Sequence, residues 1–134
     1  MTRWVGSRVA RPVRDLTRAR AFYSDLLGLT DRGGFDDHDG YDGAFFELPG
    51  GGELELTVGP TGPAPTTDED LLVLYVSSRR ERDDIATRLA TAGVPEARAA
   101  NPYWTRHGRT FLDPDGFRIV VAVTRSVTTP QPPG

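Results

Sequence analysis

Residues 9–28, VARPVRDLTRARAFYSDLLG, predict a short strand that leads into a helix. Apolar and polar residues alternate from Val9 to Val13, which is typical of a half-buried strand. Asp15 or Thr17 can cap the helix, and Gly28 stands where a glycine commonly ends one. The apolar positions that recur on one face of this helix are Phe22, Tyr23, Leu26 and Leu27.

The same order recurs in residues 71–93, LLVLYVSSRRERDDIATRLATAG. Leu71–Val76 is a continuous apolar run, consistent with a strand buried on both faces. A helix is expected from about Arg79 to Gly93, with Ile85, Ala86 and Leu89 on one face. The agreement in order, length and terminator indicates an internal repeat.

Three short strands are expected after each helix. In the first half they are residues 29–35, 43–48 and 53–58, and in the second half 94–99, 109–112 and 117–123. Asp113–Gly116 is a strong hairpin-turn signal. We therefore predict an α+β fold with two tandem β-α-β-β-β modules, forming a curved mixed sheet around a concave cleft. The modules span residues 1–58 and 71–124, joined by a Gly/Pro-rich linker over 59–70 and followed by a disordered tail over 125–134.

Composition excludes several kinds of chemistry. The 134 residues include no Cys, so disulfides, thiolate nucleophiles and zinc fingers are impossible. All 16 basic residues are Arg, which rules out Schiff-base lysines. The net charge of −3 argues against a nucleic-acid partner. No segment resembles a signal peptide or a membrane span, so we expect a cytoplasmic protein without a membrane partner.

Two motifs resemble the vicinal oxygen chelate superfamily, which includes glyoxalase I, extradiol dioxygenases, and fosfomycin and bleomycin resistance proteins. They are VRDL at Val13–Leu16, followed by LGL at Leu27–Leu29, and FLDPDG at Phe111–Gly116. The similarity covers roughly residues 8–124 and implies a glyoxalase-like fold. The strings GYDG at Gly40–Gly43 and NPYW at Asn101–Trp104 resemble an uncharacterised bacterial branch of that superfamily.

The resemblance implies that this chain lacks most of the family's metal ligands. In a metal-dependent member, His or carboxylate side chains from four strands hold a divalent cation. Here the corresponding positions carry Arg8, Glu55, Leu71 and Val120, so only Glu55 can act as a ligand. We therefore expect no metal site and no cofactor.

A guanidinium in place of a metal ligand suggests a direct interaction with the remaining carboxylate. We hypothesise that Arg8 and Glu55 face each other, forming a bidentate ion pair or jointly binding a polar ligand group. In the alternative interpretation Arg8 points outward and Glu55 is solvated. A register shift of one residue would reverse every side chain.

The segment Asn101–Arg109 concentrates aromatic and basic side chains. The resemblance places it as a loop near the cleft mouth, where Tyr103 and Trp104 either wall the ligand site or only pack against a sheet end. The predicted ligand-binding set is Arg8, Arg11, Phe46, Tyr75, Tyr103, Trp104 and Arg109. Glu55 and His107 are the candidate catalytic residues; in the alternative interpretation His107 is only a polar residue at a strand end. His38 lies in an acidic loop and is expected to be solvated.

The favoured function is a metal-independent small-molecule-binding protein of the glyoxalase/bleomycin-resistance type, with a polar, partly aromatic ligand. The resemblance also implies a homodimer. The alternative is a lyase, isomerase or dioxygenase-like enzyme that uses Glu55 or His107 as acid or base. Charge does not identify the ligand, because the net negative charge favours cations and the arginines favour anions.

Overall fold

A computed structural model describes residues 2–124, which form two compact units that divide between Pro65 and Thr66. This division lies within the segment 59–70 that the sequence marks as a linker. The predicted tail, 125–134, lies outside the described residues. Among residues 2–124, no helix is long and apolar enough to cross a membrane.

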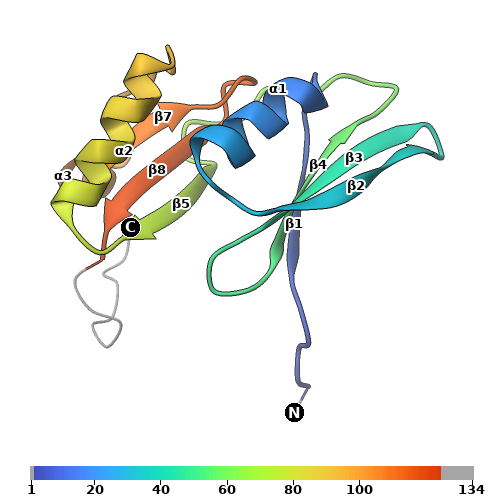
Figure 1. The fold of residues 1–134 in the computed structure, drawn as a ribbon, viewed down its shortest axis with the longest axis horizontal. Coiled ribbons are helices and arrows are strands. Elements are labelled where there is room, and N and C mark those ends of the chain that lie inside the picture. The colour runs from blue at the N-terminus through green and yellow to red at the C-terminus, as the bar shows by residue number, and fades with distance from the viewer. Residues whose placement is uncertain (1, 125–134) are drawn as a thin grey trace. The chain divides into compact units, whose positions relative to one another are not determined.

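The first unit contains one four-stranded mixed sheet and one helical segment (Figure 1). The strand order is β1-β4-β3-β2; β1 runs parallel to β4, and the other pairs are antiparallel. In chain order the elements are β1 (Arg8–Pro12), α1 (Leu16–Arg20), its π-helical continuation η1 (Ala21–Leu26), β2 (Asp31–His38), β3 (Tyr41–Glu47) and β4 (Glu53–Val58).

The second unit repeats this topology with the strand order β5-β8-β7-β6. Here β5 runs parallel to β8, and the other pairs are antiparallel. The elements are β5 (Leu71–Val76), α2 (Arg79–Thr91), β6 (Glu96–Ala97), α3 (Pro102–His107), β7 (Gly108–Leu112) and β8 (Arg118–Val123). The predicted tandem β-α-β-β-β modules and α+β fold class are therefore confirmed.

The first helical segment begins and ends at predicted residues, and α2 begins at a cap that the sequence analysis did not name. The Asp15 carboxylate accepts a hydrogen bond from the backbone N–H of Arg18 at 3.2 Å. Ser78 caps α2 in the same way, because its hydroxyl accepts from the Glu81 N–H at 3.1 Å. Gly28 follows the first helical segment with a φ of +76°, a left-handed conformation that glycine adopts without strain.

Three predicted segments differ from the structure. The acidic run 36–42 was expected to be a loop, but β2 extends to His38 and β3 begins at Tyr41, so the run forms the hairpin tip. The Asp42 carboxylate stabilises this tip by accepting from the Asp37 N–H at 2.8 Å. The strand expected over 94–99 is only the two-residue β6. The loop expected at 101–107 is instead the helix α3.

The first unit's core lies on the helix side of its sheet. Strand alternation directs Ala44 and Phe46 of β3 and Leu54 and Leu56 of β4 to one face, where all four are fully buried. Phe22 and Tyr23 of η1 are buried as well, and the Tyr23 ring lies 5.8 Å from that of Phe46. The opposite sheet face therefore carries the half-exposed polar and aromatic residues.

Candidate functional site

The non-core face of the first unit's sheet brings Arg8, Phe45, Glu53 and Glu55 together. Arg8 on β1 lies opposite Glu53 on β4, and Phe45 on β3 lies opposite Glu55. Because residues two apart on a strand share a face, these four side chains project on the same side of the sheet. The register alone is sufficient to assemble the cluster.

The Arg8 guanidinium contacts all three partners. Its Nη2 donates to Glu53 Oε1 at 2.9 Å, and its Nη1 lies 3.9 Å from Glu55 Oε1. The Cζ atom lies 4.7 Å from the centre of the Phe45 ring, within the range of a cation–π interaction. Arg8 and Glu55 face each other as predicted, but the expected bidentate ion pair is wrong, because Arg8 donates its hydrogen bond to Glu53 and lies 3.9 Å from Glu55. Their joint binding of a ligand group remains a prediction.

These residues do not fit a divalent metal. The carboxylates of Glu53 and Glu55 are directed at a guanidinium, whose positive charge opposes a cation in the same place. Within the described part of the chain, no three His, Asp or Glu side chains come together as a metal would require. In the second unit, Leu71 and Val120 offer no donor atoms.

Arg11 and Phe46 lie on the opposite face of this sheet. Arg11 is only 8% exposed, and its Nη1 donates to the Tyr23 hydroxyl at 3.4 Å. Phe46 is fully buried against Tyr23, so the expectation that it contacts a ligand is wrong. The physical reason is the two-residue period of a strand, which separates Arg11 from Arg8 and Phe46 from Phe45.

In the second unit, α3, the segment before it, the segment before β5 and the start of β5 line a cavity that is open to solvent. The Asn101 side chain caps α3 by accepting from the Tyr103 N–H at 2.9 Å, and Pro102 occupies a first-turn position. This cap sets the start of the helix that carries Trp104. The cavity has a volume of about 200 Å³ and is lined by Asp68, Glu69, Leu71, Ala99, Ala100, Asn101 and Trp104.

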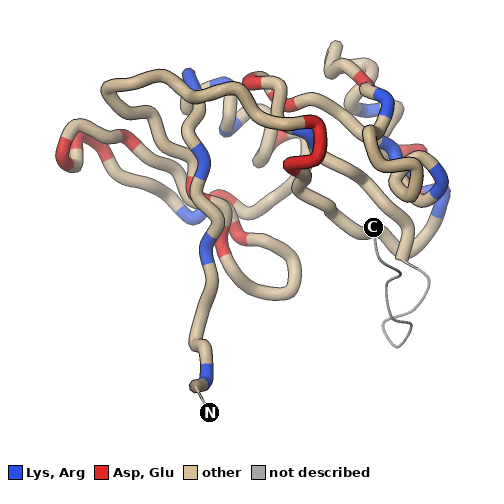
Figure 2. The backbone as a smooth tube through the Cα atoms, turned by 180° about the vertical axis from the view of Figure 1, so that it is seen from behind, with Lys and Arg blue, Asp and Glu red and all other residues tan. Residues whose placement is uncertain are grey.

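Its wall is apolar and its rim is acidic. Leu71, Ala99, Ala100 and the Trp104 ring supply the apolar surface. The acidic residues come from the run Asp68–Asp70, the red bend of three consecutive acidic residues in Figure 2. Asp68 also lies 3.3 Å from the Arg118 guanidinium. The arrangement suits a small apolar or aromatic group with a polar end directed at the rim.

Tyr103 connects Trp104 with the other predicted site residues of this unit. Its ring meets the Trp104 ring edge-on at 4.8 Å and lies 4.4 Å from the His107 imidazole. Burial raises the pKa of Tyr75, and the neighbouring Tyr103 raises it further. Tyr75, Tyr103, Trp104 and His107 are thus neighbours, whereas the acid–base role of His107 remains a prediction.

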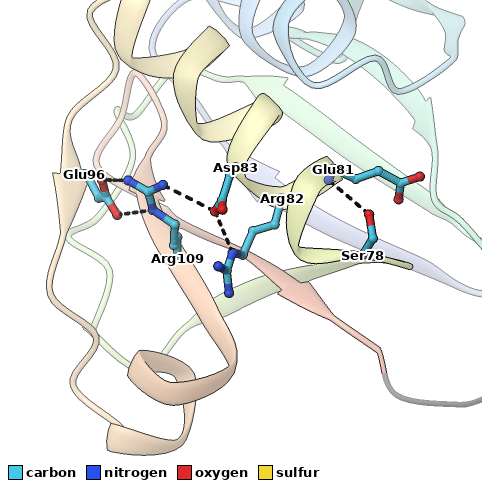
Figure 3. Close-up of polar contacts among 6 residues, drawn as sticks. All are labelled: Ser78, Glu81, Arg82, Asp83, Glu96 and Arg109. Atoms are coloured by element: carbon cyan, nitrogen blue, oxygen red, sulfur yellow. Dashed lines mark hydrogen bonds and ion pairs between the residues drawn. The ribbon is translucent and has the colours of Figure 1, made fainter.

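Arg109 points away from this cluster and is held in an ion-pair network (Figure 3). Its Nε and Nη2 donate to the two Glu96 carboxylate oxygens at 2.9 and 2.8 Å. Its Nη1 lies 3.7 Å from Asp83 of α2. The bidentate hydrogen bonding to Arg109 lowers the pKa of Glu96. Arg109 does not line the cavity, and its ligand-binding role remains a prediction.

Sequence reasoning missed Phe45, Glu53 and the helix α3. Glu53 carried a signal, because it lies two residues before Glu55 and so shares its face of the strand, whereas Phe45 is placed beside Glu55 only by the pairing of β3 with β4. The helix was indicated by Asn101 followed by Pro102, an N-cap with proline at the first helical position. The acidic cavity rim had no signal, because residues 68–70 lay in a segment interpreted only as a linker.

Comparison with known proteins matches both halves of the chain to the same family. Residues 7–57 match the YycE-like N-terminal domain, and residues 69–122 match the YycE-like C-terminal domain. The chain is 40% identical over 125 residues to the uncharacterized protein YycE of Bacillus subtilis (strain 168), covering 90% of this chain and 89% of that protein.

Solved structures show the same fold. A crystal structure of the Bacillus subtilis YycE protein, of unknown function, has a TM-score of 0.84 and 36% identity, covering 92% of each chain. Trypanothione-dependent glyoxalase I of Leishmania major has a TM-score of 0.69 and 20% identity over 90% of this chain and 87% of that one. The fosfomycin resistance protein FosX of Listeria monocytogenes, complexed with Mn(II) and sulfate, has a TM-score of 0.69 and 17% identity over 92% and 94%.

The last two likenesses establish the fold alone, and this chain's donor set differs from what a metal centre requires. The domain matches and the identity to YycE extend over nearly the whole described chain. The chain therefore belongs to the YycE-like family, and its fold is glyoxalase-like.

Proposed function

We propose that this protein is a metal-independent small-molecule-binding protein whose ligand places an apolar or aromatic group in the Trp104 cavity. The cavity itself is the observation that carries the proposal. Its volume of about 200 Å³ is below the roughly 300–1,000 Å³ typical of whole ligand pockets, so it accommodates one ring or branched group of a larger molecule.

The proposal of metal independence rests on the contacts of Arg8. Arg8 stands at the position where the resemblance expects a metal ligand, and its guanidinium lies 2.9 Å from Glu53 and 3.9 Å from Glu55. Binding in the second unit needs no metal, because an apolar wall with a few polar groups is sufficient to hold a ligand.

We infer a neutral or cationic ligand from the ion pairs of two predicted ligand-binding arginines. Arg8 pairs with Glu53, and Arg109 pairs with Glu96. A guanidinium engaged by a carboxylate has less attraction left for an anion. The carboxylate of Glu69 at the cavity would repel an anionic group as well, whereas that of Asp68 is engaged by Arg118.

Trp104 fluorescence provides the test. The variant Trp4→Phe leaves Trp104 as the only tryptophan, and 4-nitrobenzyl alcohol serves as a neutral aromatic quencher. We expect saturable quenching with a dissociation constant of about 1 mM, as a fragment of this size allows. Ala99→Leu fills the cavity and should abolish saturation, whereas Ala92→Leu, outside the cavity, should not. Linear, unsaturable quenching in every variant would refute the proposal.

The enzymatic alternative is tested in the same samples. Recovery of the unmodified probe after hours supports binding without turnover. A product whose formation is abolished by Glu55→Gln or His107→Ala would instead support a lyase or isomerase. The homodimer is likewise a proposal, for which sedimentation analysis should give twice the chain mass.

A further inference from the structure

The surroundings of the Arg8 guanidinium have the composition of a receptor for that group. Phe45 offers an aromatic face at 4.7 Å, and Glu53 and Glu55 offer carboxylate oxygens at 2.9 and 3.9 Å. An aromatic ring with flanking carboxylates recognises a planar cation through cation–π attraction and charge-assisted hydrogen bonds. These groups are therefore suited to any guanidinium, whether or not it belongs to Arg8.

The receptor groups are positioned by the sheet and not by Arg8. Phe45 and Glu55 are direct partners across β3 and β4, and Glu53 follows two residues before Glu55 on β4. Phe35 on β2 supports the Phe45 ring at 5.7 Å. The Phe35 ring lies directly over Gly43, where a Cβ atom would collide with it. The platform would thus persist if Arg8 moved away.

Once Arg8 is removed, this face of the sheet carries an excess of negative charge that attracts a cation. Glu47, the strand partner of Glu53, lies 3.7 Å from the Arg32 guanidinium. Arg8 is the cation that contacts both Glu53 and Glu55. Displacing Arg8 would therefore place two carboxylates beside an aromatic ring.

Arg8 is held loosely enough to exchange. Its side chain is 49% exposed and that of Glu53 is 36% exposed. Exposed ion pairs contribute little to stability, because water screens the charges and a long side chain loses conformational freedom on pairing. A competing guanidinium would have only this weak interaction to overcome.

We propose that Phe45, Glu53 and Glu55 form a binding site for the guanidinium or amidinium group of a small molecule, filled in the free protein by the side chain of Arg8. Arg8 then acts as an internal competitor. The apparent affinity for the ligand falls with the fraction of molecules in which Arg8 leaves the site open. The site lies in the first unit, and its existence does not depend on the Trp104 cavity.

Ligand-detected NMR titration of the full chain with benzylguanidinium tests this proposal, with Arg8→Ala as the unmasked variant. We expect an about threefold lower dissociation constant for Arg8→Ala than for the unmodified protein, because an exposed ion pair can mask the site by no more than about fivefold. Arg8→Met, which retains the apolar stem without the charge, should also bind more tightly than the unmodified protein. Far-UV circular dichroism and urea unfolding verify that each variant is folded.

Matched controls distinguish a built site from general attraction of cations. Adding Glu55→Gln or Phe45→Leu to Arg8→Ala should raise the dissociation constant at least fivefold, whereas adding Glu47→Gln should change it less than twofold. Neutral benzylurea should not bind. Equal affinity of the unmodified protein and both Arg8 variants would overturn the proposal, as would binding that Glu55→Gln leaves unchanged. Repeating the titration in Ala99→Leu separates this site from the Trp104 cavity, because only binding at the cavity should be lost.

Discussion

Removing the ion pair between Arg109 and Glu96 tests whether Arg109 stabilises the second unit. The two hydrogen bonds, of 2.9 and 2.8 Å, join β7 to β6, and Asp83 of α2 lies 3.7 Å from the same guanidinium (Figure 3). The side chains are 38% and 43% exposed, so solvent screening keeps the interaction modest. Exposed pairs contribute about 0.2–1 kcal/mol, and bidentate geometry places this one near the upper limit.

A double-mutant cycle with Arg109→Gln and Glu96→Gln measures this coupling. Urea unfolding at pH 7, followed by far-UV circular dichroism, should give a coupling free energy of about 1 kcal/mol. The exposed pair Arg32 and Glu47, separated by 3.7 Å, serves as the control and should give about 0.3 kcal/mol or less.

The pH dependence of the cycle provides a second, independent result. Hydrogen bonding to Arg109 lowers the pKa of Glu96, so this carboxyl is more acidic in the folded than in the unfolded chain. Its contribution to stability is therefore complete above the unfolded pKa of about 4.3 and is lost as the pH falls through the lower folded pKa. A coupling no larger than the control, or one that does not decrease in acid, would refute this reasoning and leave Arg109 available for a ligand.

Three further substitutions test individual contacts by urea unfolding. Phe46→Leu should lower the free energy of unfolding by about 1–2 kcal/mol, because it removes part of the core around Tyr23, and it should leave Trp104 quenching unchanged. Asp113→Ala should lower the free energy of unfolding by about 2 kcal/mol, since the buried carboxylate accepts from the backbone N–H of Phe117 at 2.8 Å. The control Asp115→Ala retains that hydrogen bond and should lower the free energy of unfolding by less than half as much. Gly34→Ala should cost about 2 kcal/mol or more, because a Cβ atom would collide with the backbone carbonyl of residue 43; wild-type stability would contradict that contact.

The repeated fold could be predicted because its signals are local. The cap at Asp15, the glycines at 28 and 93, and the apolar runs each specify an element from neighbouring residues. The short β6 could not be predicted in the same way. Two residues carry no measurable periodicity, and its pairing with β7 is set by tertiary contacts.

The candidate site could be predicted only in part. Once β1 is assumed to pair in parallel with β4, strand alternation predicts that Arg8 and Glu55 lie on the same face of the sheet. The structure confirms this placement. Phe46 was assigned to the wrong face because a strand places adjacent residues on opposite sides, and no sequence feature marked Phe45 as the one on the open face. The partners of Arg109 lie 13 and 26 positions away, beyond the reach of local patterns.

Titration of Trp104 fluorescence in metal-depleted protein tests the proposed function most directly. The Trp4→Phe chain, treated with EDTA and verified by elemental analysis, is titrated with 4-nitrobenzyl alcohol before and after addition of Mn(II). We predict saturable quenching with the same dissociation constant in both samples, within twofold. Saturation that appears only after Mn(II) is added would contradict metal-independent binding.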